Sequence, residues 1–152
     1  MTNVMGEEKE TRTVIDASGL ILGRMASITA KRLLLGESIT IVNAEKAVIS
    51  GKRLSKVKDA KRFLEVGHPG KGPFHPRRPD QIIRRTVRGM LPRRLPKGQA
   101  ALKRLKVFLG LPQELKETQL QTIPEANVNK LKCPYVTMGE FAKEIGYKAE
   151  GK

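Results

Sequence analysis

The chain has little of what several classes of protein require. It has one cysteine, Cys133, among 152 residues, so an intrachain disulfide framework is excluded. It has no tryptophan, and aromatic residues make up only 4% of it, too few for a surface that mainly stacks single-stranded bases on rings. No apolar run approaches the roughly 20 residues of a membrane-spanning helix. The polar, acidic first ten residues lack the apolar segment of a secretory signal. We expect a cytoplasmic protein that does not contact a membrane.

Motifs for cofactors and catalysis are missing as well. Gly19 and Gly23 lie in a strand–turn–helix where a phosphate loop would stand, but neither glycine-rich nucleotide motif is present. His68, His75 and Cys133 are the only imidazole or thiol side chains, too few for a four-ligand zinc site. No nucleophile elbow of the G-x-S-x-G type occurs. The sequence therefore predicts no cofactor, no metal, no small-molecule substrate and no enzymatic activity, and Cys133 is expected to be a small packing residue.

Positive charge is what the chain has in excess. It carries 30 Lys and Arg against 15 Asp and Glu, a formal net charge of +15. Residues 52–106 contain 18 of the basic residues and only three acids, so the remainder is balanced, with 12 residues of each sign. A face that only needs solvation mixes both signs. A localised excess instead indicates a polyanionic partner such as nucleic acid.

The hydrophobic pattern predicts one α/β domain over residues 1–152, with residues 1–11 as a disordered tail. A strand at 13–15, a helix at 21–35 begun by Ser18 as cap, and a strand at 38–43 form a βαβ unit, and hence a parallel sheet. Residues 111–134 show no clear periodicity and are expected to wrap the surface. The remaining expected elements are a short strand at 48–50 and helices at 52–66, 81–91, 98–109 and 138–145.

Residues 67–79 differ in kind from the rest of the chain. Four prolines and three glycines exclude regular structure there, so we expect an extended basic loop that is mobile without its partner. Phe74 has two open roles, a small hydrophobic anchor or a ring that stacks on a base. His75 and His68 likewise either contact a nucleotide or are simply exposed to solvent.

The segment from Arg84 to Gly110 contains no acid. The helix expected at 81–91, with Asp80 as its cap, buries its apolar residues and leaves Arg84, Arg85 and Arg88 together on the other side. A Pro-bounded basic turn and a helix with an exposed basic face follow. A low aromatic content favours contact with backbone and shape over base reading, and folded RNA accommodates such a surface. The residues expected to contact RNA are Lys71, Phe74, His75, Arg77, Arg78, Arg84, Arg85, Arg88, Arg93, Arg94, Lys97 and Arg104.

Three spaced blocks carry a family resemblance: Val87-Arg-Gly-Met-Leu-Pro, then Gly98-Gln99, then Leu105-Lys-Val-Phe-Leu-Gly110. Their sequences and spacing resemble the signature of the ribosomal protein L13 family of the large subunit. Three further blocks resemble the same family: Leu22-Gly-Arg-Met-Ala together with Asp16, then Val42-Asn-Ala-Glu, and then Ile49-Ser-Gly-Lys. Gly72-Pro-Phe-His followed by Arg84-Arg-Thr-Val-Arg resembles its archaeal and eukaryotic branch.

The resemblance implies a three-layer α/β domain with a small central parallel sheet flanked by helices. It also implies a structural role in the large ribosomal subunit, with large-subunit rRNA and neighbouring ribosomal proteins as partners and subunit assembly as the process served. On the signature, Met90 and Leu91 are expected to pack, and Gly89 and Pro92 to shape the backbone. Two alternatives stay open from the residues alone: an enzyme acting on a phosphorylated substrate at the Gly19–Gly23 turn, and a DNA-binding architectural protein.

Overall fold

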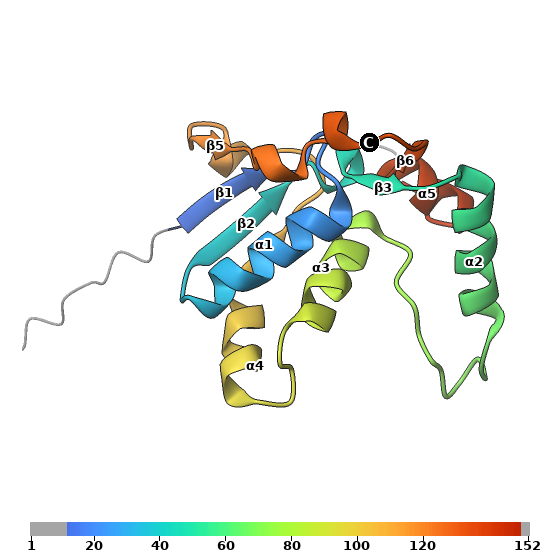
Figure 1. Ribbon diagram of the computed structural model, residues 1–152. Coiled ribbons are helices and arrows are strands. Elements are labelled where there is room, and N and C mark those ends of the chain that lie inside the picture. Colours follow the sequence, from blue (N-terminus) through green and yellow to red (C-terminus); the bar gives the residue numbers. More distant parts are fainter. Residues whose placement is uncertain (1–11, 150–152) are drawn as a thin grey trace, which may run out of the picture.

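A computed structural model describes residues 12–149, and its centre is the predicted parallel sheet (Figure 1). β1 (Arg12–Asp16) leads through α1 (Leu22–Leu34) to β2 (Ser38–Val42), and the two strands pair in parallel. β4 (Leu105–Val107) adds to the other edge of β2, and β5 (Leu120–Gln121) adds to β1. The order β4-β2-β1-β5 is parallel throughout, which confirms the α/β class.

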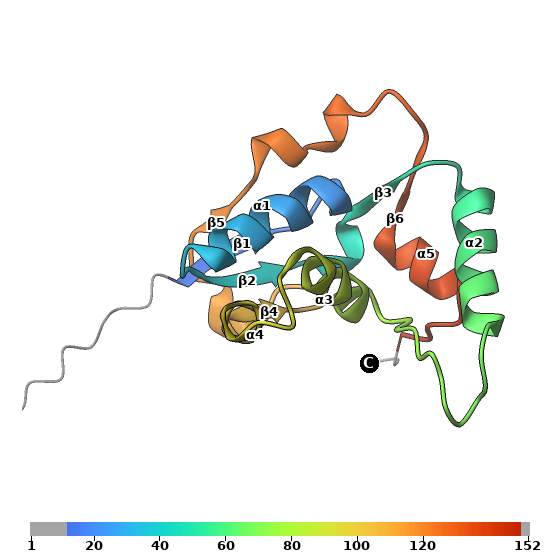
Figure 2. The ribbon, with the colours of Figure 1, turned by 60° about the horizontal axis from the view of Figure 1, so that its bottom comes forward.

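A second, two-stranded sheet lies at the far end of the molecule (Figures 1 and 2). β3 (Val48–Ser50) pairs antiparallel with β6 (Tyr135–Thr137), and α5 (Met138–Glu144) follows. α2 (Arg53–Glu65) packs beside α5, and Arg53 forms an ion pair with Glu144. Within residues 12–149, four short 3₁₀ turns complete the connections: η1 (Ala44–Lys46), η2 (Gln113–Leu115), η3 (Pro124–Ala126) and η4 (Val128–Lys130).

The main core lies between one face of the four-stranded sheet and the helices α1, α3 (Pro79–Met90) and α4 (Pro96–Lys103). Strand alternation places Ile39 and Ile41 on this face, and helical spacing brings Met25 and Leu33 of α1 onto them. Ile83 of α3 belongs to the same cluster, and α1 and α3 are in contact. The helices are therefore held firmly against the sheet, and this fixes the position of their outer faces.

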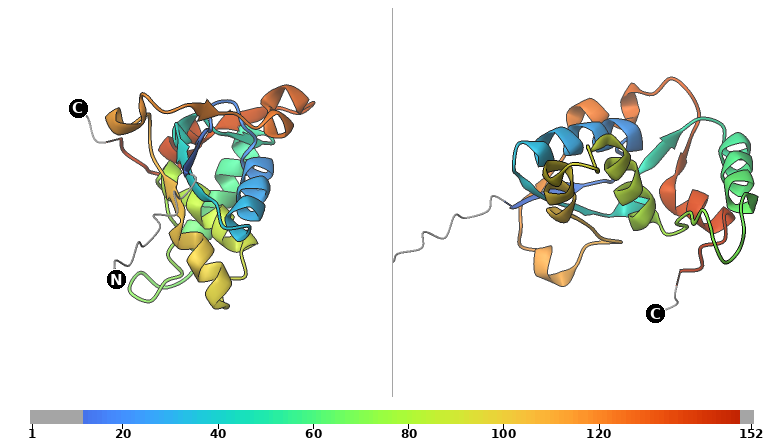
Figure 3. Two further views of the ribbon diagram at one scale, coloured as in Figure 1. Left: turned by 90° about the vertical axis from the view of Figure 1, so that its left-hand side faces the viewer. Right: turned by 90° about the horizontal axis from the view of Figure 1, so that it is seen from below.

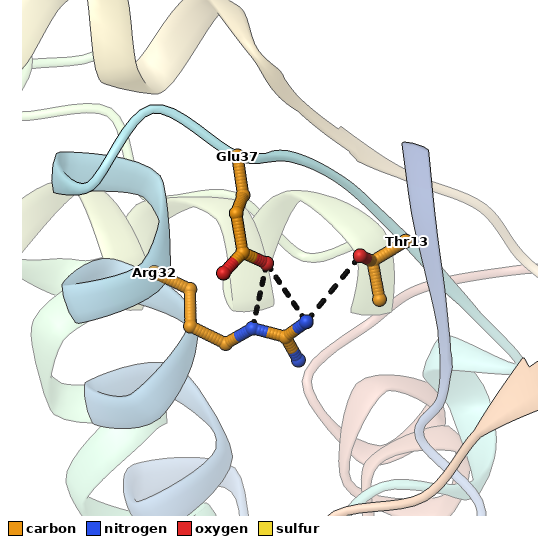
Figure 4. A network of polar contacts seen from close by, with 3 residues as sticks. All are labelled: Thr13, Arg32 and Glu37. Atoms are coloured by element: carbon orange, nitrogen blue, oxygen red, sulfur yellow. Dashed lines mark hydrogen bonds and ion pairs between the residues drawn. The ribbon is translucent and has the colours of Figure 1, made fainter. Parts of the chain in front are cut away.

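The C-terminal end of α1 is tied to the sheet by one arginine (Figure 4). The Nε and Nη2 atoms of Arg32 both approach Oε2 of Glu37, at 2.8 and 2.7 Å, and Nη2 also donates to Oγ1 of Thr13 at 3.3 Å. Glu37 lies in the turn between α1 and β2, and Thr13 lies on β1. The three side chains therefore join the helix to the first strand and to the turn before the second.

The helix predicted at 98–109 is wrong in its second half. α4 ends at Lys103, and residues 105–107 form β4 instead. The periodicity of Leu102, Leu105 and Leu109 suits a helix locally. However, the open edge of β2 offers backbone partners, and Phe108 N donates to Ile41 O at 2.8 Å. Tertiary pairing outweighs local pattern here.

Smaller expectations fail for identifiable reasons. Ser18 does not cap α1, because its amide and hydroxyl both donate to Asp16. Asp80 lies inside the first turn of α3 and pairs with Arg78, so it is not the cap. Met90 does not pack: 44% of it is exposed at the end of α3. Cys133 is also exposed. In contrast, α5 has a side-chain cap, because Thr137 accepts a hydrogen bond from Glu140 N.

The chain between α2 and α3 is irregular apart from an antiparallel bridge between His68 and Gly72. Its mobility in the free protein stays a prediction, as does the division of the chain into a single domain. The tail expected at 1–11 lies outside the described residues. Among residues 12–149, no helix combines the length and apolar character needed to cross a membrane.

Candidate nucleic-acid interface

A groove runs between α3, α4 and the irregular segment before α3, and we call it the arginine groove. α3 is strongly amphipathic: Ile83 and Val87 are fully buried against the sheet, so the arginines of the same helix point outward. Eight residues line the groove: Phe74, His75, Pro76, Gln81, Arg84, Arg85, Arg88 and Leu102. No acid is among them, so the groove carries uncompensated positive charge.

Two of the three arginines are held in place by backbone carbonyls. Arg84 Nη1 donates to the carbonyl of Leu105 on β4 at 3.1 Å, and Arg85 Nη1 donates to the carbonyl of Phe74 at 3.0 Å. A guanidinium has five N–H donors, so each arginine keeps several for a ligand. Arg88 is exposed and has no hydrogen-bond or ion-pair partner among the described residues. The groove thus offers two guanidinium groups in fixed orientations, those of Arg84 and Arg85, and a third, that of Arg88, which can adapt to a ligand.

The aromatic residues of the loop lie at the edge of this groove. Phe74 is 71% exposed, and its carbonyl anchors Arg85. The ring of His75 is half-buried and tilted against that of Phe63 on α2, with centroids 5.8 Å apart. His68 instead accepts a hydrogen bond from Gly70 N within the loop. His75 therefore packs against the protein, whereas the Phe74 ring is open to a partner.

The turn between α3 and α4 presents its cations on a well-defined backbone. Leu95 N donates to Pro92 O at 2.9 Å, and Gly98 N donates to Leu95 O at 3.1 Å. Gly98 is buried so close to the chain that a Cβ there would overlap the carbonyl oxygen of Pro92. The side chains of Arg93, Arg94 and Lys97 extend from this turn into solvent.

The structure does not bring every predicted residue to these two places. Lys71 and Arg77 are exposed on the irregular segment, outside the arginine groove. Arg78 pairs with Asp80 at 3.2 Å. Arg104 is half-buried, and its Nη2 donates to the carbonyl of Leu33 at 2.7 Å. A cation at that point also suits the negative end of the α1 dipole, so Arg104 has a role in the fold itself.

The Gly19–Gly23 turn, where the sequence left a phosphate site open, begins beside the carboxylate of Asp16. Asp16 accepts hydrogen bonds from Ser18 N at 3.0 Å, Ser18 Oγ at 2.8 Å and Asn43 Nδ2 at 2.9 Å. Burial acts to raise the pKa of Asp16, but these hydrogen bonds and nearby Lys46 outweigh it and hold the pKa below its ordinary value. An ionised carboxylate repels a phosphate, so the turn is structural. Within residues 12–149, no three His, Cys, Asp or Glu side chains gather as a metal site would require.

Sequence comparisons agree with the resemblance seen in the residues. The sequence model of a family described as "Ribosomal protein L13" matches residues 10–114. A protein of Methanosarcina barkeri named "Large ribosomal subunit protein uL13" is 51% identical over 138 residues, which cover 90% of this chain and 99% of the relative. A protein of the same name from Methanopyrus kandleri is 44% identical over 147 residues, covering 95% and 92%. Another, from Methanocaldococcus jannaschii, is 46% identical over 141 residues, covering 90% and 98%.

Proposed function

Because this chain belongs to the ribosomal protein L13 family, it is a structural component of the large ribosomal subunit and not an enzyme, and we propose that its arginine groove binds phosphates of large-subunit rRNA. The observation that carries the proposal is the acid-free lining around Arg84, Arg85 and Arg88. Three guanidinium groups on one helix face repel one another unless anions lie between them. Converging rRNA backbones supply such anions, and each arginine fork can take a phosphate bidentately.

The neighbouring cations extend this surface. The side chains of Arg93, Arg94 and Lys97 extend from a turn beside the groove whose backbone is already held by hydrogen bonds. Binding of RNA therefore costs little conformational entropy of the backbone at this turn. Phe74 offers an exposed ring and His75 a partly exposed one for contact with a nucleotide. The whole set proposed to contact rRNA is Lys71, Phe74, His75, Arg77, Arg78, Arg84, Arg85, Arg88, Arg93, Arg94, Lys97 and Arg104. Neighbouring ribosomal proteins are the other partners, and the ribosome in the cytoplasm is the place of action.

The test compares two double variants with equal loss of charge. Arg85→Gln with Arg88→Gln removes two groove cations. Arg24→Gln with Arg62→Gln removes two exposed arginines that do not line the groove. Binding to a transcript of large-subunit rRNA is measured over a salt series, with duplex DNA as competitor at matched salt. We expect the groove variant to bind more weakly and to lose about 1.4–1.8 from the salt slope, since each phosphate contact contributes roughly 0.7–0.9.

The same variants are then followed through a high-salt gradient with large subunits. The wild-type protein and the control should sediment with the subunit, and the groove variant should be depleted from it. Equal binding and equal salt slopes for the two double variants would contradict the groove as the rRNA site. Displacement of the RNA by duplex DNA at matched salt would contradict RNA as the preferred ligand.

A further inference from the structure

The second face of the four-stranded sheet carries a hollow of its own, which we call the sheet hollow. Ile39 and Ile41 point toward α1, so strand alternation places Ser38 and Thr40 on the opposite face. Figure 3 shows α1 on one side of the sheet and the segment after β4 on the other. The hollow lies on that second side. Its lining is Arg12, Val14, Ser38, Thr40, Lys103, Arg104, Lys106, Phe108, Pro112, Gln113, Glu114, Leu115 and Thr118.

The charge of the sheet hollow is strongly one-sided. Arg12, Lys103 and Lys106 are exposed at its edge, and Arg104 adds a half-buried cation. The single acid of the lining is Glu114. None of the ion pairs found among residues 12–149 involves any of these side chains. Four cations against a single acid attract an anionic ligand that extends along the surface.

The hollow also contains an aromatic ring on a rigid support. Phe108 directly follows β4, and its backbone N–H donates to Ile41 O at 2.8 Å, which fixes where the side chain begins. The residue is 38% exposed, so the ring is partly open to the hollow. Aromatic rings held against a sheet beside lysines are a means by which proteins bind unpaired bases and their phosphates. The hydroxyl of Thr40 adds a donor and acceptor on the strand between β1 and β4.

Size is compatible with such a ligand. The hollow has a volume of about 810 Å³, within the range of pockets that enclose molecules of nucleotide size. Its lining mixes apolar side chains (Val14, Phe108, Leu115) with the cations at the edge. A duplex backbone would meet the cations alone and leave the ring unused, whereas an unpaired strand satisfies both.

We propose that the sheet hollow binds an unpaired stretch of RNA, with a base on Phe108 and phosphates on Lys103, Lys106 and Arg12. The proposal rests on the ribosomal role given above and adds a second RNA surface to it. α4 separates the two surfaces, since Leu102 lines the arginine groove and Lys103 lines the sheet hollow. One small domain would thereby fasten two segments of RNA on different faces.

The first experiment measures binding of the full chain to a fluorescent twelve-nucleotide oligouridylate and to an RNA duplex of equal length. Lys103→Gln with Lys106→Gln is compared with Lys130→Gln with Lys132→Gln, a pair of exposed lysines outside both surfaces. We expect the first pair to lower the salt slope for oligouridylate by about 1.4, because each phosphate of a single strand contributes roughly 0.7. An equal change of the salt slope in the two double variants overturns the proposal. A loss of binding to the duplex without a loss of binding to oligouridylate overturns it as well.

The second experiment isolates the ring. Phe108→Leu keeps the apolar volume and removes stacking, while Phe108→Tyr retains an aromatic face. Binding of oligouridylate should weaken roughly tenfold in the leucine variant and stay near wild type in the tyrosine variant, given the usual contribution of base stacking. Unfolding midpoints of the three proteins check that they are equally folded. Equal affinity of the leucine and tyrosine variants overturns the proposal.

A parallel measurement separates this inference from the function on which it rests. The variant Arg85→Gln with Arg88→Gln is tested against the rRNA transcript alongside the sheet-hollow variants. Loss in the groove variant with no loss in the sheet-hollow variants rejects the second surface and leaves the rRNA role intact. A photo-crosslinking residue at position 108 in assembled subunits gives an independent readout: attachment to rRNA supports the proposal, and attachment to another protein overturns it.

Discussion

The side-chain amide of Asn43 donates a hydrogen bond to the carboxylate of Asp16 at 2.9 Å, from a residue whose backbone is left-handed, with φ of 55°. The contact joins the end of β2 to the end of β1, two strands that run side by side. Asn tolerates this conformation better than most residues. The amide and the backbone of Asn43 therefore contribute separately to the fold.

Replacement of Asn43 by Gly and by Ala separates the two contributions. Gly accepts the left-handed backbone and loses only the hydrogen bond to a charged group, so we expect a cost of about 1.5–3 kcal/mol. Ala loses the same bond and adds strain of about 1–2 kcal/mol. Urea unfolding of both variants measures the difference. Equal stability of the Gly and Ala variants would show that backbone strain at residue 43 is negligible.

The Asp16 carboxylate gives the stability a defined dependence on pH. Its pKa in the folded protein is lowered, so folding favours the ionised form. That stability is present above the ordinary pKa of an aspartate and is lost as the pH falls through the lowered folded value. Asp16→Asn should therefore be clearly less stable than wild type at pH 7, and the gap should narrow below about pH 4. A gap that stays constant down to pH 2 contradicts this assignment.

Two helical glycines should respond oppositely to alanine. Gly98 is enclosed, and a Cβ there would overlap Pro92 O, so Gly98→Ala is expected to destabilise by about 1–3 kcal/mol. Gly89 in α3 has open space around its Cβ position, and Gly89→Ala is expected to stabilise by about 1 kcal/mol. Thermal unfolding of the two variants tests the pair. Stabilisation by Gly98→Ala would show that the α3–α4 turn can rearrange.

Two threonines offer a second matched pair. Thr29 is fully buried in α1, and its hydroxyl has no hydrogen-bond partner among residues 12–149. Thr29→Val removes that unsatisfied group and should stabilise the protein by about 1 kcal/mol. The hydroxyl of Thr86 donates to Ile82 O at 2.9 Å, so Thr86→Val should not stabilise. Denaturant midpoints of the two variants, compared at constant m-value, measure these changes in stability. A destabilised Thr29→Val would show that the Thr29 hydroxyl has a hydrogen-bond partner after all.

Replacement of Arg104 and of Arg94 shows which of the residues predicted to contact RNA also stabilise the fold. Arg104 donates to Leu33 O at the end of α1, whereas Arg94 is exposed on the turn. We expect Arg104→Gln to cost about 1–2 kcal/mol of stability. Arg94→Gln should leave stability within about 0.5 kcal/mol and weaken binding to an rRNA transcript. The pair is measured by unfolding and by binding on the same preparations, and an unaffected midpoint for Arg104→Gln contradicts its structural role.

Local patterns were sufficient for the elements that local chemistry decides. The β1-α1-β2 unit follows from apolar spacing, and α5 lies within the range 138–145 expected from the sequence. β4 could not be predicted in this way, because residues 105–107 become a strand only where the edge of β2 accepts them. The error also hid the sheet hollow, since Lys106 reaches that face only as part of a strand.

The candidate groove shows the same division. The shared face of Arg84, Arg85 and Arg88 follows from positions three and four apart on a helix. The carbonyls that orient two of them come from Phe74 and Leu105, which reach α3 through the irregular segment and through β4. Sequence reasoning locates the charges, whereas their orientation depends on contacts between segments distant in the chain.

The pairing of β3 with β6 has a consequence for synthesis. The strands of the main sheet lie within residues 12–121, so that sheet can close while the last part of the chain is still being made. β3 must wait for residues 135–137, and α2 must wait for α5. During translation, β3 therefore lacks its partner strand and α2 lacks α5 until residues 135–144 have been made, although Val48 N can already donate to Leu20 O and Phe63 can already meet His75. Synthesis of residues 135–144, rather than growth of the four-stranded sheet, completes the pairing of β3 and the packing of α2.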